Sequence, residues 1–192
     1  VAQMATVFET LLKELDDHPN KINPSTLRTV AQSLDFLGEL LSHRETAASS
    51  VRFDAMKVLV VDDDILTLQA VSHSLEKAAL KPDCFEDPRE ACRLLGSKTY
   101  DLVIIDVNMP GMDGFELCKR LRTLPGNKHT PVIFLTRLSG FENRLKSAMS
   151  GGNDFIAKPF TFVELTVKAV TQLLRSHIAY HSAKDPGFKA MG

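Results

Sequence analysis

Apolar and polar positions along residues 56–176 follow a pattern that predicts five short strands, each followed by a helix. The strand segments are short apolar runs, and the segments between them carry apolar residues at helical spacing. Since the run Leu102–Ile105 is unbroken by polar residues, we expect parallel strands that helices cover on both faces. The pattern therefore predicts an α/β fold with a doubly wound five-stranded parallel sheet. The strands are expected at 57–61, 83–86, 102–105, 131–135 and 154–157, and the helices at 65–79, 88–95, 115–121, 141–149 and 162–176.

The first 45 residues carry a different pattern, with two helical apolar stripes separated by a polar turn. One helix is expected from Met4 to about Asp16. The next is expected to begin after Asn23, which can cap it, with Pro24 in the first helical position. Two helices with one apolar stripe each predict a hairpin, which buries little surface alone and needs a further surface to pack on.

The chain of 192 residues fits one main domain with an appendage. We predict a helical hairpin over 1–45, a linker over 46–55, the main domain over 56–178 and a flexible tail over 179–192. Val1 is not an initiator methionine, so we expect a processed chain or an excised piece of a longer one.

Composition limits the classes of partner that we expect for this protein. The net charge is −1 with acids and bases interspersed, and no pair of helices looks like a DNA reader, so we expect no direct DNA binding. No apolar stretch approaches the roughly 20 residues of a membrane span, and no signal peptide is recognisable, so we expect no membrane contact and a cytoplasmic location. Three cysteines without Cys-x-x-Cys spacing indicate reduced thiols.

The candidate functional residues follow the predicted strands. We expect them to lie close together, because the carboxyl ends of parallel strands meet at one edge of the sheet. The groups expected there are the acids Asp62 to Asp64, Asp106, Thr136 and Lys158. Clustered carboxylates repel one another unless a cation joins them, and hard oxygen ligands suit Mg²⁺. Asp106 can then act as a nucleophile that forms an acyl phosphate, with Lys158 as a charge on the phosphoryl oxygens and Thr136 as a hydroxyl donor.

The motifs Val-Asp-Asp, Ile-Asp-Val-Asn-Met-Pro-Gly-Met-Asp-Gly, Leu-Thr and Ala-Lys-Pro-Phe occur in this order. Over Met56 to Arg175 the chain therefore resembles the receiver domain of two-component response regulators. The resemblance implies a flavodoxin-like fold and phosphorylation of Asp106 by the phosphohistidine of a histidine kinase or histidine-phosphotransfer protein. It also implies that Mg²⁺ is held by Asp63, Asp106 and the main chain of Asn108, with Asp62 acting partly through water.

The same resemblance implies a phosphoacceptor in a signalling pathway rather than an enzyme with a separate substrate. Phosphorylation would draw Thr136 inward and reorient Phe155 on the fifth strand, which changes a face that meets a downstream protein target. This sequence departs from the family at Arg137, where a small residue is usual. Arg137 would either cover the phosphoryl pocket or point to solvent.

The hairpin resembles the last two helices of the histidine-phosphotransfer domain of chemotaxis-type kinases. The resemblance rests on Phe-Glu-Thr-Leu-Leu-Lys-Glu-Leu from Phe8 and Asn-Pro-Ser-Thr-Leu from Asn23, while the family's His-x-x-Lys-Gly motif is absent. The hairpin is then either a half-bundle left by excision or a bundle completed by a second chain, which would give a homodimer.

Two other functions compete with the phosphorylation switch. A phosphohydrolase of the haloacid dehalogenase type would use the Asp-x-Asp of Asp62 to Asp64, but that family follows its acids with Gly-Thr, and here Ile65 and Leu66 follow. A degenerate receiver would work as an unphosphorylated docking or dimerisation module, an alternative that Arg137 and the hairpin leave open.

Overall fold

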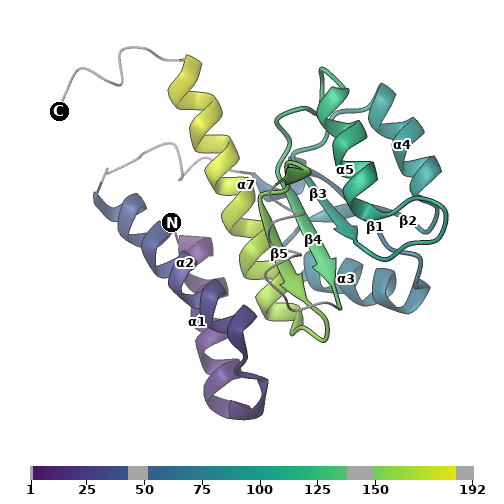
Figure 1. Ribbon diagram of the computed structural model, residues 1–192. Coiled ribbons are helices and arrows are strands. Elements are labelled where there is room, and N and C mark those ends of the chain that lie inside the picture. The colour runs from purple at the N-terminus through teal and green to yellow at the C-terminus, as the bar shows by residue number, and fades with distance from the viewer. Residues whose placement is uncertain (1, 43–51, 138–148, 185–192) are drawn as a thin grey trace. The chain divides into compact units, whose positions relative to one another are not determined.

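The computed structural model describes residues 2–42, 52–137 and 149–184 (Figure 1). The chain forms two compact units. One comprises Phe53–Thr166, and the other comprises Val1–Arg52 together with Val167–Gly192. The predicted helix at 141–149 lies outside the described residues, apart from its last position. No helix in the described ranges has the length and apolar character needed to cross a membrane.

A single parallel sheet of five strands organises the unit Phe53–Thr166 (Figure 1). The strand order is β2-β1-β3-β4-β5. The strands are β1 (Lys57–Val61), β2 (Lys81–Phe85), β3 (Leu102–Asp106), β4 (Val132–Thr136) and β5 (Asp154–Ala157). All neighbouring strands pair in parallel, which confirms the predicted flavodoxin-like fold.

Both faces of the sheet are buried, as the unbroken apolar runs predicted. On one face, Leu59, Val103 and Phe134 belong to a core that includes side chains from α4 (Pro88–Ser97) and α5 (Gly114–Thr123). On the other face, α3 (Ile65–Lys77) contributes a buried stripe. That stripe consists of Leu68, Val71 and Leu75. A parallel sheet covered on both faces can carry chemistry only at its strand ends.

Aspartates start the helices that follow the strands. Asp64, Asp87 and Asp113 each accept a hydrogen bond from a main-chain N–H in the first turn of α3, α4 and α5. Each satisfies a donor that the helix itself leaves unpaired. Of the three consecutive acids Asp62 to Asp64, the last is therefore a helix cap, which leaves the first two for the strand end.

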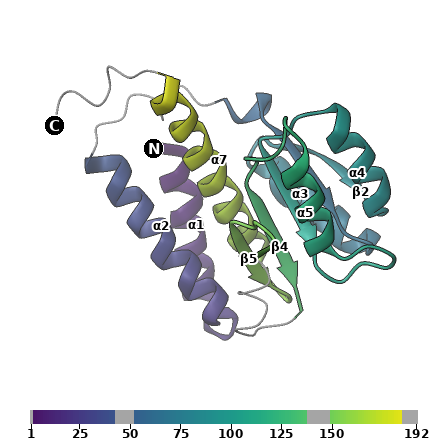
Figure 2. The same cartoon turned by 45° about the horizontal axis from the view of Figure 1, so that its top comes forward.

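The hairpin has the predicted form, with α1 (Ala2–Asp17), a 3₁₀ turn (Pro19–Lys21) and α2 (Pro24–Ser42) (Figure 2). Asn23 caps α2, because its side-chain oxygen accepts the N–H groups of Ser25 and Thr26 at 2.8 and 3.1 Å. A further 3₁₀ turn, Phe53–Ala55, lies within the predicted linker.

The last helix, α7 (Phe162–Lys184), is longer than predicted. We expected it to end near Ser176, yet no proline or glycine follows before Pro186 and Gly187, so nothing in the intervening sequence breaks a helix. From Val167 onward this helix belongs to the same unit as the hairpin. The Lys168 amine donates to the Gln32 side-chain oxygen at 3.1 Å, and the Arg175 guanidinium lies 4.9 Å from the centre of the Phe36 ring.

Candidate functional site

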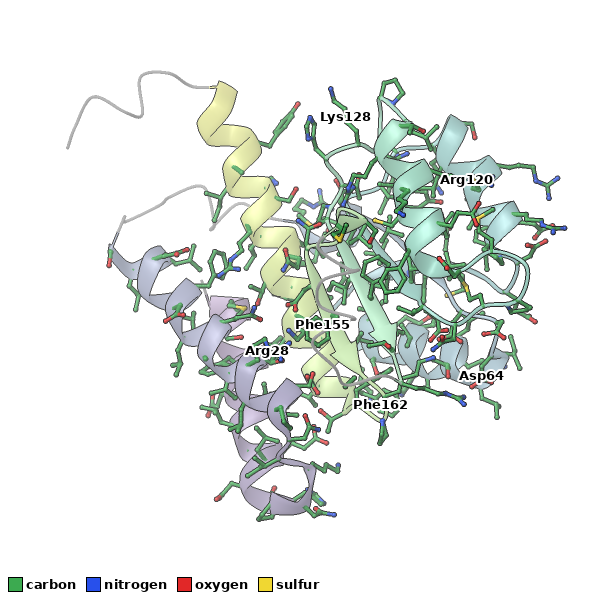
Figure 3. All side chains as sticks on the ribbon, viewed as in Figure 1. Arg28, Asp64, Arg120, Lys128, Phe155 and Phe162 are labelled. Carbon is green, nitrogen blue, oxygen red and sulfur yellow. The ribbon has the colours of Figure 1, made fainter. Side chains whose placement is uncertain are left out.

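The predicted site residues lie where β1, β3, β4 and β5 end. Asp62 directly follows β1, Asp106 ends β3, Thr136 ends β4 and Lys158 directly follows β5. Figure 3 shows Asp64 and Phe162 at this end of the sheet, the end to which the strand arrows point. The sheet register thus brings together residues that are almost a hundred positions apart in the chain.

Lys158 joins the two buried carboxylates. Its amine lies 2.7 Å from Asp62 Oδ2 and 2.6 Å from Asp106 Oδ1. The side chains of Asp62 and Asp106 are 1% and 5% exposed, so these contacts form in an environment that is almost closed to water. A buried charge is stable only when it is paired and hydrogen-bonded, and Lys158 supplies that pairing for both acids.

Main-chain N–H groups hold the other oxygens. Asp62 Oδ1 accepts from the N–H of Asp64 at 3.0 Å, and Asp106 Oδ2 accepts from the N–H of Asn108 at 2.7 Å. Both carboxylates are thus fixed by the loop that follows their own strand and by Lys158. This arrangement orients them before any ligand arrives.

Three carboxylates meet at one point. Single oxygens of Asp62, Asp63 and Asp106 all lie within 4.8 Å of one another. Asp63 is exposed, so the group opens to solvent on one side. Three negative charges face one lysine, and this excess suits a hard divalent cation that keeps several waters. The residues therefore fit Mg²⁺.

Burial and charge pull the pKa values of the buried groups in opposite directions. Burial raises the pKa of the Asp62 carboxyl, although hydrogen bonds from Lys158 and from the N–H of Asp64 oppose it. Burial lowers the pKa of the Lys158 amine, but its bonds to Asp106 and Asp62 outweigh burial and the net change is upward. Lys158 thus keeps its positive charge. Its contact with Asp62 does not fully offset the cost of burying the Asp62 carboxylate.

Thr136 and Phe155 differ in how near they lie to the acids. Thr136 is 1% exposed, and its carbonyl oxygen accepts from the N–H of Lys158 at 2.6 Å. Phe155 pairs in register with Phe134, two positions before the end of β4. Phe155 is half-buried and lies inside β5, whereas Thr136 is the last residue of β4.

An open groove of about 550 Å³ leads away from Lys158. Its walls come from the start of α3, from Arg137 after β4 and from the segment between β5 and α7. Arg137 is exposed and lines this groove, in contrast to the buried acids. The other lining residues are Asp64, Leu66, Thr67, Ala70, Lys158, Pro159, Phe160 and Phe162. The sequence motifs name Lys158 and Arg137 but give no sign that Leu66, Phe160 and Phe162 belong to the same surface.

The model of the response regulator receiver domain matches residues 58–170 of this chain. The chain belongs to the response regulator receiver family. The match includes all of the strand-end acids and Lys158, and receiver domains bind Mg²⁺ in an acidic pocket of this kind. The family match begins after the hairpin, so the resemblance of residues 1–45 to a phosphotransfer domain stays a prediction.

Individual receiver proteins agree with the fold. The chemotaxis response regulator CheY4 of Vibrio cholerae is 36% identical, with a TM-score of 0.58 over 62% of this chain and 98% of that one. The beryllofluoride-activated receiver domain of DrrB is 31% identical, with a TM-score of 0.54 over 62% of this chain and 97% of that one. Both similarities cover the receiver part alone.

The curated relatives correct one prediction. Transcriptional regulatory protein HprR of Escherichia coli is 37% identical over 68% of this chain and 56% of its own length. Heme response regulator HssR of Staphylococcus epidermidis is 38% identical over 62% of this chain and 52% of its own length. The expectation of no direct DNA binding is wrong, because HprR and other receiver relatives are transcriptional regulators by name. The chain spans about half the length of these relatives. The prediction rested on the net charge of this chain, which carries no information about the other half of such a relative.

Proposed function

We propose that this receiver accepts a phosphoryl group on Asp106 from a phosphohistidine partner and acts as a phosphorylation switch in a two-component pathway. The observation that carries the proposal is the contact of Lys158 with both Asp62 and Asp106, next to the exposed Asp63. The Lys158 amine is in contact with the Asp106 carboxylate, so it is close enough to bind an oxygen of a phosphoryl group attached to Asp106. The similarity to a DrrB receiver activated by beryllofluoride supports the same chemistry.

In the proposed reaction, a carboxylate oxygen of Asp106 attacks the phosphorus atom. An O–P bond forms, the N–P bond of the phosphohistidine breaks, and its electron pair leaves on the imidazole nitrogen, which takes up a proton. Mg²⁺, held by Asp63, Asp106 and the main chain of Asn108, with Asp62 partly through water, would neutralise charge on the phosphoryl oxygens. Lys158 would exchange its contact with Asp106 for a phosphoryl oxygen, and the Thr136 hydroxyl would donate to another.

The proposed switch rests on the same residues. Thr136 adjoins Lys158 through the main chain, and Phe155 lies on the neighbouring strand. A hydroxyl drawn toward a new anion at Asp106 leaves space behind it at the end of β4. We propose that Phe155 reorients into that space, which changes the surface of β5.

The experiment that tests this proposal is intact mass spectrometry after incubation with acetyl phosphate and Mg²⁺. Wild type is expected to gain one phosphoryl group, and Asp106→Asn is expected to gain none. An adduct that persists in Asp106→Asn but disappears in Asp62→Asn would favour haloacid dehalogenase chemistry instead. A folded wild type without any adduct would contradict the proposal and leave the unphosphorylated docking module.

A further inference from the structure

The groove beside Lys158 carries a second cation, Arg137, and we propose that Arg137 is a specificity-determining residue that binds the anionic phosphodonor. This inference rests on the proposed phosphorylation of Asp106. Arg137 immediately follows Thr136 and is exposed, whereas Thr136 itself is buried. The chain therefore changes at this point from the buried site to the surface that an incoming donor meets first.

The charges around the groove show what Arg137 adds. Lys158 is already engaged by two buried carboxylates, and a divalent cation at the three aspartates would complete the neutralisation of that group. A phosphodonor brings about two further negative charges at neutral pH. Arg137 lines the groove beside Lys158 and adds a second positive charge on the path proposed for this dianion.

The shape of the groove favours recognition of the donor over closure of the site. Its volume of about 550 Å³ lies in the range of small-molecule sites, and Arg137 stands in its wall. The apolar part of the wall is also accessible, since Leu66 is 70% exposed and Phe162 is 50% exposed. The Phe160 and Phe162 rings meet edge to face with their centres 6.4 Å apart, which gives the organic part of a donor an aromatic surface.

A guanidinium in this position acts on binding more than on the chemical step. Arg137 is exposed and lines the groove, so it can hold the phosphoryl oxygens of a donor there without fixing the geometry at Asp106. An interaction made equally with the bound donor and with the transition state changes the half-saturation concentration and leaves the maximal rate alone. Arg137 thus sets which donors react at low concentration.

The test measures the rate of adduct formation against acetyl phosphate concentration by intact mass, with Mg²⁺ present throughout. Arg137→Ala is expected to raise the half-saturation concentration about three- to five-fold with an unchanged maximal rate, the range of an exposed ion pair. Arg137→Lys is expected to fall between wild type and Arg137→Ala. The matched control is Arg93→Ala, which removes an exposed arginine from α4 and is expected to behave as wild type.

Two results would overturn the inference. An unchanged half-saturation concentration in Arg137→Ala would show that Arg137 does not meet the donor, and a lowered one would show that Arg137 covers the pocket. The proposed function fails separately, since its failure is a wild type that gains no phosphoryl group. A phosphorylated wild type with an insensitive Arg137→Ala variant would contradict this inference alone.

Discussion

Gly114, the first residue of α5, lies against the main chain of Asp106. A Cβ atom at Gly114 would meet the Asp106 carbonyl oxygen at 2.2 Å and the Ile105 Cγ2 atom at 2.9 Å. The N–H of Gly114 also donates to the carbonyl oxygen of Val107 at 3.0 Å. The loop after β3 therefore closes on the strand that carries the candidate phosphoacceptor, and it closes at a position that has room for no side chain.

We predict that Gly114→Ala destabilises the protein by about 1–3 kcal/mol, because main-chain atoms must move to admit the methyl group. The displaced Asp106 is also expected to react more slowly with acetyl phosphate. Urea unfolding and adduct formation measure the two effects. The control is Gly96→Ala in α4, whose Cβ would meet nothing within 4 Å and which is expected to stabilise by about 0.5–1 kcal/mol. Equal stability of the two variants would show that the contact at Gly114 relaxes without cost.

The contact at Gly114 marks the limit of what the sequence could predict. Unbroken apolar runs predicted buried parallel strands, and strand order along the chain predicted that Asp62, Asp106 and Lys158 would share one edge. Spacing alone does not reveal distances across the sheet, so neither the two contacts of Lys158 nor the clash at Gly114 could be derived. In the sequence, Gly114 is only the last residue of the motif Ile-Asp-Val-Asn-Met-Pro-Gly-Met-Asp-Gly.

Other features escaped prediction because they depend on surfaces rather than on periodicity. The groove joins α3 to the segment before α7, and no motif relates Leu66 to Phe162. The length of α7 was misjudged because polar residues were taken as a helix end, although only proline and glycine would have enforced one. The shared position of Asp62, Asp106, Thr136 and Lys158 at one edge of the sheet could be predicted, because each residue ends a strand or directly follows one.

Mg²⁺ is expected to raise the thermal unfolding temperature, because a ligand that binds only the folded state stabilises it by mass action. At a concentration of a hundred times its Kd the stabilisation is about 2.7 kcal/mol. Asp63→Asn is expected to abolish this gain and to leave metal-free stability near wild type, since Asp63 is exposed. Thermal scans across a Mg²⁺ titration measure both effects. Glu86→Gln removes one exposed charge outside the cluster, and loss of the Mg²⁺ effect in that variant too would argue against a site at Asp63.

In the middle of β2, at the edge of the sheet, Asp83 predicts a dependence of stability on pH. Its Oδ2 accepts hydrogen bonds from the Lys98 amine and, at 2.7 Å, from the Tyr100 hydroxyl. Burial opposes ionisation of Asp83, but these bonds outweigh it and hold the pKa of the carboxyl below its ordinary value of 3.8. A lowered pKa in the folded state stabilises the fold above the unfolded-state pKa, and this contribution is lost as pH falls through the folded-state pKa.

We therefore expect Asp83→Asn to be less stable than wild type at neutral pH by up to about 1 kcal/mol, since the pair is partly exposed. The difference should shrink as pH falls below about 4. Urea unfolding of both proteins between pH 3 and pH 7, set with buffers of about equal ionic strength, measures it. A difference that grows toward low pH would show that the charge of Asp83 is unfavourable in the folded protein.

Phe36 offers a test of the unit that contains the hairpin. Its side chain is 3% exposed, and the guanidinium of Arg175 in α7 lies over its ring. Removing the ring leaves a cavity and takes away the aromatic partner of Arg175. Phe36→Ala is expected to cost about 3–5 kcal/mol in that unit and to lower amide hydrogen-exchange protection in α1 and α2. Leu34→Ala, in the same helix and 55% exposed in wild type, is the matched control and should change protection little.

Protection in β1 and β3 and phosphorylation of Asp106 are expected to persist in Phe36→Ala, because those residues belong to the other unit. Equal loss of protection in β1 and β3 would mean that the receiver sheet depends on the hairpin for its stability.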